Sequence, residues 1–122
     1  MKRKFRLNRS TDFKRVRQSG KSYAHPLIVL IALPNETGRT RFGVAAGRSV
    51  GGAVQRNQAK RWLRETVRSQ LAYVPPGWDV VLLARRPIMQ ADFQEVRAAV
   101  VALLRRARLW QERDGLSTAS DF

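Results

Sequence analysis

Runs of apolar residues along the chain predict the strands of a small sheet. Residues 27–33 and Trp78–Ala84 are almost continuously apolar and have the length of buried strands. The shorter run Arg41–Ala46 predicts another strand. The turn-forming residues 35–38, between the runs 27–33 and 41–46, suggest a hairpin of those two strands. A further short strand is expected near residues 22–24.

Apolar residues at helical spacing predict helices around these strands. A short helix is expected over residues 11–18, capped by Ser10 or Thr11 and ended by Gly20. Phe13 and Val16 lie on one side of it. A long helix is expected over residues 53–71, after a glycine-containing loop at residues 47–52 and before the Pro-Pro-Gly break at residues 75–77.

A third helix begins at a capping box, in which Asp92 is the N-cap and Glu95 lies three residues later. It is expected to run to about Arg108. Its core face consists of Phe93, Val96, Val100, Leu103, Leu104 and Ala107.

The element order α-β-β-α-β-α, with the possible extra strand, predicts a single α+β domain built on one small mixed sheet. A chain of 122 residues fits one domain. We expect the domain to span residues 1–113, and the polar residues 114–122 to form a flexible tail.

The net charge of +15, from 24 Lys and Arg against 9 Asp and Glu, narrows the function. Because 43% of the residues are apolar, the chain is not a disordered basic tail. A strongly basic folded chain usually has a polyanion as partner, and nucleic acid is the first candidate. The alternative is charge that serves only solubility, but such surfaces normally intersperse both signs.

Several other classes of protein find no support in the composition. The chain has no cysteine, which excludes disulfides and thiolate metal sites. Its longest apolar run is too short to span a bilayer, and its basic N-terminus lacks the apolar core of a signal peptide. We therefore expect a cytoplasmic protein. With one histidine (His25) and no paired carboxylates, we assign no catalytic residue and no metal ligand.

The helix at residues 53–71 carries a dense row of positive charge. At about 100° per residue, Ala59, Trp62, Leu63 and Val67 share an arc that can pack on the sheet. Like charges four residues apart repel by a few tenths of a kcal/mol each, so the row needs an anionic partner or remains a solvated face. We predict a docking ridge for a phosphodiester backbone, consisting of Arg56, Lys60, Arg64 and Arg68, widened by Asn57 and Arg61. The Asn57 amide could bond a 2′-hydroxyl or a base edge, or could simply face solvent.

The same segment resembles the RNR motif of the bacterial ribonuclease P protein family. The matching residues are Ala53, Val54, Arg56, Asn57, Lys60, Arg61, Arg64 and Glu65. Three more blocks follow the family pattern in register: residues 7–13, with Asp12-Phe13; residues 41–44, with Arg41 and Gly43; and residues 84–87, Ala-Arg-Arg-Pro. The resemblance covers about residues 5–110.

The resemblance implies a protein cofactor of an RNA enzyme that removes the 5′ leader of precursor tRNA. The catalytic centre then lies on the RNA subunit, and Mg²⁺ is bound through that RNA and not by the protein alone. The partners implied are the catalytic RNA and the precursor tRNA leader, with no membrane and with one protein monomer in the ribonucleoprotein. The family fold further implies a left-handed crossover around the RNR helix, against the usual right-handed preference.

Site residues also follow from the resemblance. The RNA-binding residues are those of the RNR-like helix, with Arg48 in the loop before it. A cleft between the sheet and the first helix holds the leader, and Phe13, Arg17 and Ile31 fall at its positions. A basic N-terminal arm contributes Arg3, Lys4, Arg6 and Arg9.

Four departures from the family pattern bear on these contacts. Gln58 replaces the second arginine of the RNR motif, and Gly52 stands where asparagine is common. Arg17 and Ile31 occupy positions that are often aromatic. Since a stacked base contributes roughly 1–3 kcal/mol, we expect the leader to be held more by charge and less by stacking.

Two other functions fit the charge. A general RNA-binding module, such as a ribosomal protein or an RNA chaperone, would share it without preferring one structured RNA. A membrane-surface protein would need a basic helix whose other face is apolar and exposed, and here that face is needed for the sheet.

Overall fold

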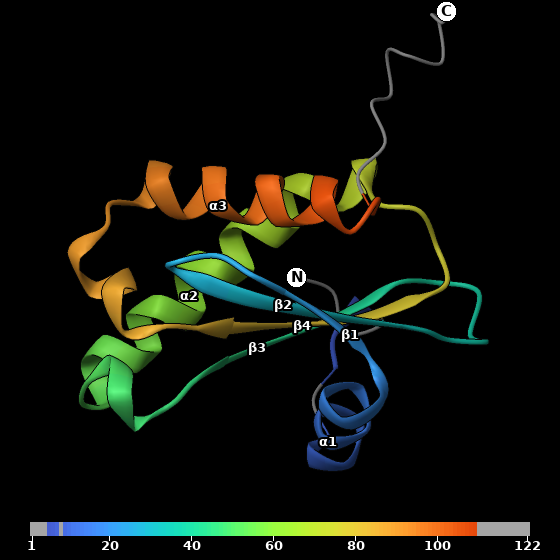
Figure 1. Cartoon of the computed structure of the whole chain (residues 1–122), viewed down its shortest axis with the longest axis horizontal. Coiled ribbons are helices and arrows are strands. Elements are labelled where there is room, and N and C mark those ends of the chain that lie inside the picture. The colour runs from blue at the N-terminus through green and yellow to red at the C-terminus, as the bar shows by residue number, and fades with distance from the viewer. Residues whose placement is uncertain (1–4, 8, 110–122) are drawn as a thin grey trace, which may run out of the picture.

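The computed structural model describes residues 5–7 and 9–109 (Figure 1). Within them the α-helices are α1 (Ser10–Ser19), α2 (Ala53–Gln70) and α3 (Phe93–Arg106). The strands are β1 (Lys21–Ala24), β2 (Ile28–Pro34), β3 (Arg41–Ala46) and β4 (Trp78–Ala84). Short 3-10 turns lie at η2 (Arg48–Val50), η3 (Leu71–Tyr73) and η4 (Arg86–Gln90). The α+β class and the extra strand β1 are thereby confirmed.

The four strands form one mixed sheet with the order β1-β2-β4-β3. Strand β2 pairs antiparallel with β1 and β4, whereas β3 runs parallel to β4. Helix α2 forms the crossover between these two parallel neighbours.

The predicted hairpin between β2 and β3 is wrong, because β4 lies between them. Residues Val80, Val81 and Leu82 of β4 are fully buried, so this strand needs a layer on each face and a neighbour on each edge. The turn at residues 35–38 therefore passes over the start of β4, where the Asn35 backbone amide donates to the Gly77 carbonyl at 2.8 Å.

Helices cover both faces of the sheet (Figure 1): α2 and α3 lie on one face and α1 lies on the other. Because side chains alternate along a strand, each strand contributes to two cores. Ile28, Leu30 and Leu82 pack under α2 and α3, whereas Ile31 and Val81 pack with Val16 of α1. The α1 core is much the smaller of the two.

The sequence predicted the start of α3 and the end of α1 correctly, but not the residue that caps the start of α1. The capping box of α3 is confirmed: the Glu95 amide donates to the Asp92 carboxylate at 2.8 Å, and the Asp92 amide donates to Glu95 at 2.9 Å. Gly20 ends α1 as predicted, because its backbone is extended, and only glycine fits there, because a Cβ would lie 2.6 Å from the Val16 carbonyl oxygen. The predicted Ser10 or Thr11 cap is wrong, because α1 already includes Ser10 and its N-cap is Arg9, without a side-chain hydrogen bond.

Among the described residues, no helix combines the length and the apolar character needed to cross a membrane.

Candidate nucleic-acid interface

One arc of α2 anchors the helix on the sheet and so turns its basic residues outward. Ala59, Leu63 and Val67 are at most 1% exposed and belong to the main core. Trp62 is half-buried and meets Phe93 of α3 edge-on, with ring centroids 6.1 Å apart. The predicted apolar arc is therefore confirmed.

The outer face of α2 forms a shallow basic hollow of about 530 Å³. Two side chains in it are held by neighbours three residues away. Arg61 donates to the Gln58 side-chain oxygen at 3.2 Å, and Arg68 pairs with Glu65 at 2.6 Å. Gln58 thus orients Arg61, although it stands at the position where the RNR motif has its second arginine. The hollow is lined by Val54, Asn57, Gln58, Arg61, Arg64, Glu65 and Arg68.

A larger groove of about 830 Å³ lies between α1 and the end of β3, and α2 closes one side of it. Three cationic side chains and no carboxylate line this groove, so it suits a phosphodiester chain. We call it the α1–β3 cleft. Its lining residues are Ser10, Phe13, Lys14, Arg17 and Gln18 of α1, Val44, Ala45 and Ala46 of β3, and Lys60 of α2.

The predicted leader positions divide between the cleft and the core. Phe13 and Arg17 line the α1–β3 cleft. Ile31 does not: its side chain is 5% exposed and packs beneath α1 with Val16 and Val81. The residue alternation on β2 directs it toward α1, where the helix covers it, so its placement in the leader cleft is corrected.

The predicted single ridge on α2 is also divided. Lys60 faces the α1–β3 cleft, whereas Arg61 and Arg68 face the outer hollow. Arg64 lies between the two, since it also lines a smaller crevice of about 220 Å³ with Arg6. Arg56 is half-buried near the start of the helix. The helix therefore serves two surfaces, which a ridge drawn on a helical wheel does not reveal.

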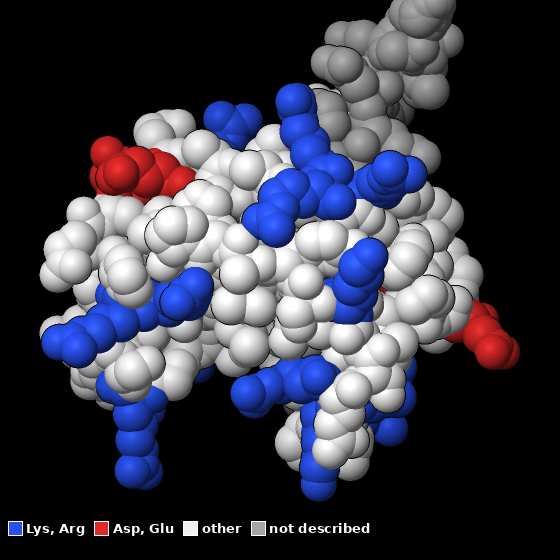
Figure 2. Space-filling view, viewed as in Figure 1, with Lys and Arg blue, Asp and Glu red and all other residues white. Residues whose placement is uncertain are grey.

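The remaining predicted contacts lie close to these surfaces. Arg48 is exposed in η2, immediately before α2. Arg6 and Arg9 are exposed, and Arg6 bridges Phe42 of β3. Arg3 and Lys4 lie outside the described residues. Figure 2 shows basic side chains projecting on both sides of the recess at the lower edge of the molecule, whereas the acidic side chains of that view lie mainly at the upper left and at the right edge.

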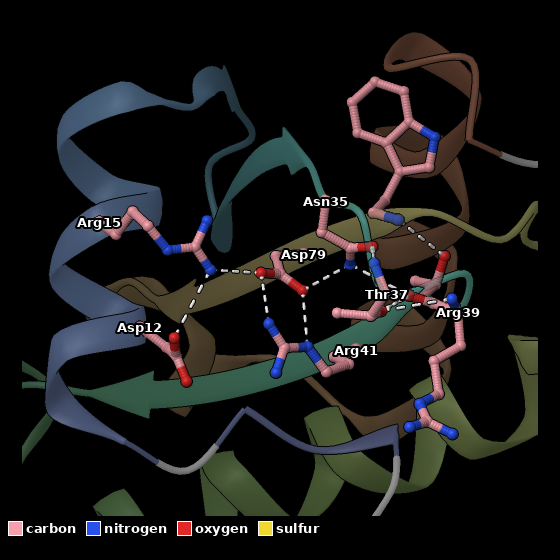
Figure 3. Close-up of polar contacts among 9 residues, drawn as sticks. Asp12, Arg15, Asn35, Thr37, Arg39, Arg41 and Asp79 are labelled. Carbon is pink, nitrogen blue, oxygen red and sulfur yellow. Dashed lines mark hydrogen bonds and ion pairs between the residues drawn. The ribbon is translucent and has the colours of Figure 1, made fainter.

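A buried carboxylate, which the sequence analysis did not single out, lies at the start of β4 (Figure 3). Asp79 is fully buried and accepts hydrogen bonds from Arg15, Arg41 and Asn35. Burial alone would raise the pKa of Asp79, but the hydrogen bonds from Arg41, Arg15 and Asn35 together outweigh it, so this pKa lies below its ordinary value. The signal in the sequence was one acid at the head of an otherwise apolar strand.

Metal ligands of the usual kind do not gather in the part of the chain that the structure describes. No group of three or more His, Cys, Asp or Glu side chains there could hold a metal ion. The chemistry these surfaces offer is the binding of anions and of bases.

Comparison with known proteins identifies the family of the chain. The model of the ribonuclease P family matches residues 1–108. The chain belongs to the ribonuclease P protein family. A ribonuclease P protein component from Herpetosiphon aurantiacus is 40% identical over 114 residues, which are 93% of each chain. One from Pelotomaculum thermopropionicum is 40% identical over 103 residues, 84% of this chain and 92% of the relative.

Solved structures of ribonuclease P proteins share the fold. The Thermotoga maritima protein superposes with a TM-score of 0.76 at 32% identity, covering 83% of this chain and 96% of its own. The Staphylococcus aureus protein superposes with a TM-score of 0.81 at 25% identity, covering 88% and 98%. The family assignment makes this chain a protein cofactor within an endoribonuclease complex, and the general RNA-binding module is not favoured.

Proposed function

We propose that the two basic surfaces bind two different RNAs. The outer hollow of α2 binds the RNA subunit of ribonuclease P, and the α1–β3 cleft holds the 5′ leader of precursor tRNA. The observation that carries this proposal is the division of α2: Lys60 lines the cleft, while Arg61 and Arg68 line the outer hollow. One rigid helix can therefore hold the leader at a fixed distance from the RNA that cuts it.

The chemistry of the cleft suits a single strand. Lys14, Arg17 and Lys60 supply positive charge along the groove, and Phe13 supplies the one aromatic ring of its lining. Cations follow the phosphates, while a ring accepts a base of any sequence by stacking. Because the lining contains one aromatic ring and three cations, we expect charge to contribute more than stacking to leader binding. Arg17, at a position that is often aromatic in the family, adds to this preference.

Catalysis in this proposal belongs to the RNA subunit. Mg²⁺ bound through that RNA would supply the activation of water for a hydrolysis that leaves the 5′-phosphate on the mature tRNA, and we assign no residue of this chain to that step. The protein neutralises phosphates of the folded RNA and releases counterions, which lowers the Mg²⁺ concentration the complex needs. It acts as a monomer in the ribonucleoprotein, in the cytoplasm.

The test is cleavage of precursor tRNA by the cognate RNA subunit at low Mg²⁺, with and without the protein. We expect a large gain in rate that an unrelated protein of equal net charge does not give. Equal rates with the charge-matched protein would overturn the cofactor role and would favour the alternative function, a general RNA-binding module.

The leader contact needs its own measurement. The affinity of the assembled complex for precursor tRNA, divided by its affinity for tRNA without the leader, reports on the cleft alone. Phe13→Ala is expected to lower this ratio while leaving the affinity for the RNA subunit unchanged. A ratio unaffected by Phe13→Ala would place the leader elsewhere.

A further inference from the structure

Asp79 connects four segments of the fold at one buried point (Figure 3). Arg41, at the start of β3, donates from Nε and Nη2 to its two carboxylate oxygens at 2.9 and 2.8 Å. Asn35, just after β2, donates to Oδ1 at 2.8 Å. Arg15 of α1 donates to Oδ2 and also pairs with Asp12 at 3.5 Å. Each oxygen of this fully buried carboxylate thus accepts from two donors.

Arg15 is the polar link between α1 and the sheet. Among the described residues, it makes the one side-chain hydrogen bond that runs from α1 to a strand. The other contacts of α1 are apolar: Val16 and Phe13 pack against the small core beneath the helix. Apolar contacts are not directional, whereas a charged hydrogen bond to a fixed carboxylate sets an angle and a distance. The apolar contacts therefore keep α1 on the sheet, while the Arg15 hydrogen bond sets the orientation of the helix.

The network and the α1–β3 cleft lie on opposite flanks of the same helix. At 100° per residue, Asp12 and Arg15 fall on one side of buried Val16, and Phe13 and Arg17 fall on the other. The hydrogen-bond network of Asp79 contacts α1 at the start of β3 and β4, while the cleft opens at the end of β3. A rotation of α1 at the network would thus change the position of the residues that line the cleft.

We propose that Asp79 is a positioning residue for substrate recognition: through Arg15 it holds α1 at the angle that keeps the α1–β3 cleft open to a single RNA strand. Asp79 is buried and does not line the cleft, so it acts without touching RNA. This inference rests on the proposed function of the cleft.

Two substitutions separate positioning from simple electrostatics, because they change the charge in opposite directions. Arg15→Met removes a positive charge, and Asp79→Asn removes a negative one. If charge alone controlled leader binding, the first would weaken it and the second would strengthen it. If the position of α1 controls it, both lower the ratio of affinities for precursor and leaderless tRNA. We expect each to lower it about tenfold, the effect of one lost stacked base.

A double variant adds a readout that general destabilisation would not give. If Asp79 acts through Arg15, the double variant should lose no more of the ratio than the stronger single variant. Losses that multiply would overturn the proposed route. Arg97→Met is the matched control, since Arg97 is an exposed cation on α3, on the other face of the sheet, and its loss should leave the ratio unchanged.

Folding and the proposed function are checked in the same experiment. RNA-subunit affinity reports on α2 and should stay at the wild-type value in both single variants. The Arg15 side chain is 41% exposed, so Arg15→Met carries the test if Asp79→Asn does not fold. If Phe13→Ala lowers the ratio and the network variants do not, the positioning inference fails alone. If Phe13→Ala also leaves it unchanged, the proposed function fails.

Discussion

The ring of Phe13 rests directly on the backbone of Gly43. A Cβ at Gly43 would lie 2.5 Å from Cζ of Phe13, closer than atoms in proteins approach, and 3.1 Å from Cβ of Leu7. Gly43 is thus the position on β3 that lets α1 lie close to the sheet with its aromatic ring at the inner wall of the cleft. This contact explains why the R-x-G block of the family pattern has a glycine at this position: a larger residue would collide with the Phe13 ring.

Gly43→Ala is accordingly expected to disturb the cleft more than the fold. The first atom it meets is the tip of a half-buried ring, which can swing outward into the groove. We expect the ratio of affinities for precursor and leaderless tRNA to fall about five- to tenfold, or about 1 kcal/mol of stacking. Equilibrium binding to the assembled complex measures it.

Gly47→Ala is the matched control for this change. A Cβ at Gly47 meets no atom within 4 Å, and its φ of −81° suits any residue. It should leave the ratio at the wild-type value. Equal effects of the two alanines would mean that backbone stiffness, and not the Phe13 contact, matters.

Arg61→Met and Arg68→Met should weaken binding to the RNA subunit, because both side chains line the outer hollow. For each phosphate that the protein no longer neutralises, the slope of log affinity against log salt should fall by about 1. Salt titrations of RNA-subunit binding measure this. Lys60→Met, facing the cleft, should instead lower the ratio for precursor over leaderless tRNA.

Arg97→Met is again the charge-matched control for this pair of surfaces. An identical salt slope for Arg61→Met and Arg97→Met would show that net charge, and not the outer hollow, attracts the RNA. If Lys60→Met behaved like Arg61→Met in both assays, the division of α2 into two surfaces would be wrong.

Local patterns predicted the elements well because each depends on neighbours in the chain. The capping box at Asp92 and the buried arc Ala59, Leu63 and Val67 depend on residues at most eight apart. The pairing of β2 with β4 does not: the turn at residues 35–38 is equally consistent with adjacent strands and with strands that leave room for a third. Only the burial of four successive residues of β4, from Asp79 to Leu82, requires the central place in the sheet.

The sequence shows which residues of the candidate site are basic, but it does not show which surface each of them lines. A helical wheel of α2 shows which residues are basic, but the closeness of α1 decides that Lys60 belongs to the cleft. Ile31 matched a leader position in the pattern, yet the helix above it covers its side chain. The role of Asp79 could not be predicted from the sequence, because its three hydrogen-bond partners lie 38 to 64 positions away in the chain.

Asp92→Ala should destabilise the protein without affecting either RNA surface. It removes the acceptor for the Glu95 amide at the start of α3. Loss of such a cap costs about 0.5–2 kcal/mol in the free energy of unfolding. Urea unfolding measures it, and the affinity ratio for precursor tRNA should not change. An unchanged urea midpoint would mean that solvent satisfies this helix end equally well.

The pH dependence of stability should report on Asp79. Its pKa in the folded protein lies below that of an unfolded aspartate, about 3.9, because hydrogen bonds from the arginines and Asn35 outweigh burial. A depressed folded pKa stabilises the fold fully above the unfolded pKa, and this contribution is lost as pH falls through the folded value. We therefore expect the urea midpoint of the RNA-free protein to fall below about pH 4. The difference between wild type and Asp79→Asn should shrink over the same window, which isolates Asp79 from the other acids. A difference that stays constant from about pH 6 to about pH 2 would mean that this carboxylate does not titrate with folding, and that packing of the Asp79 side chain, not its charge, holds the network together.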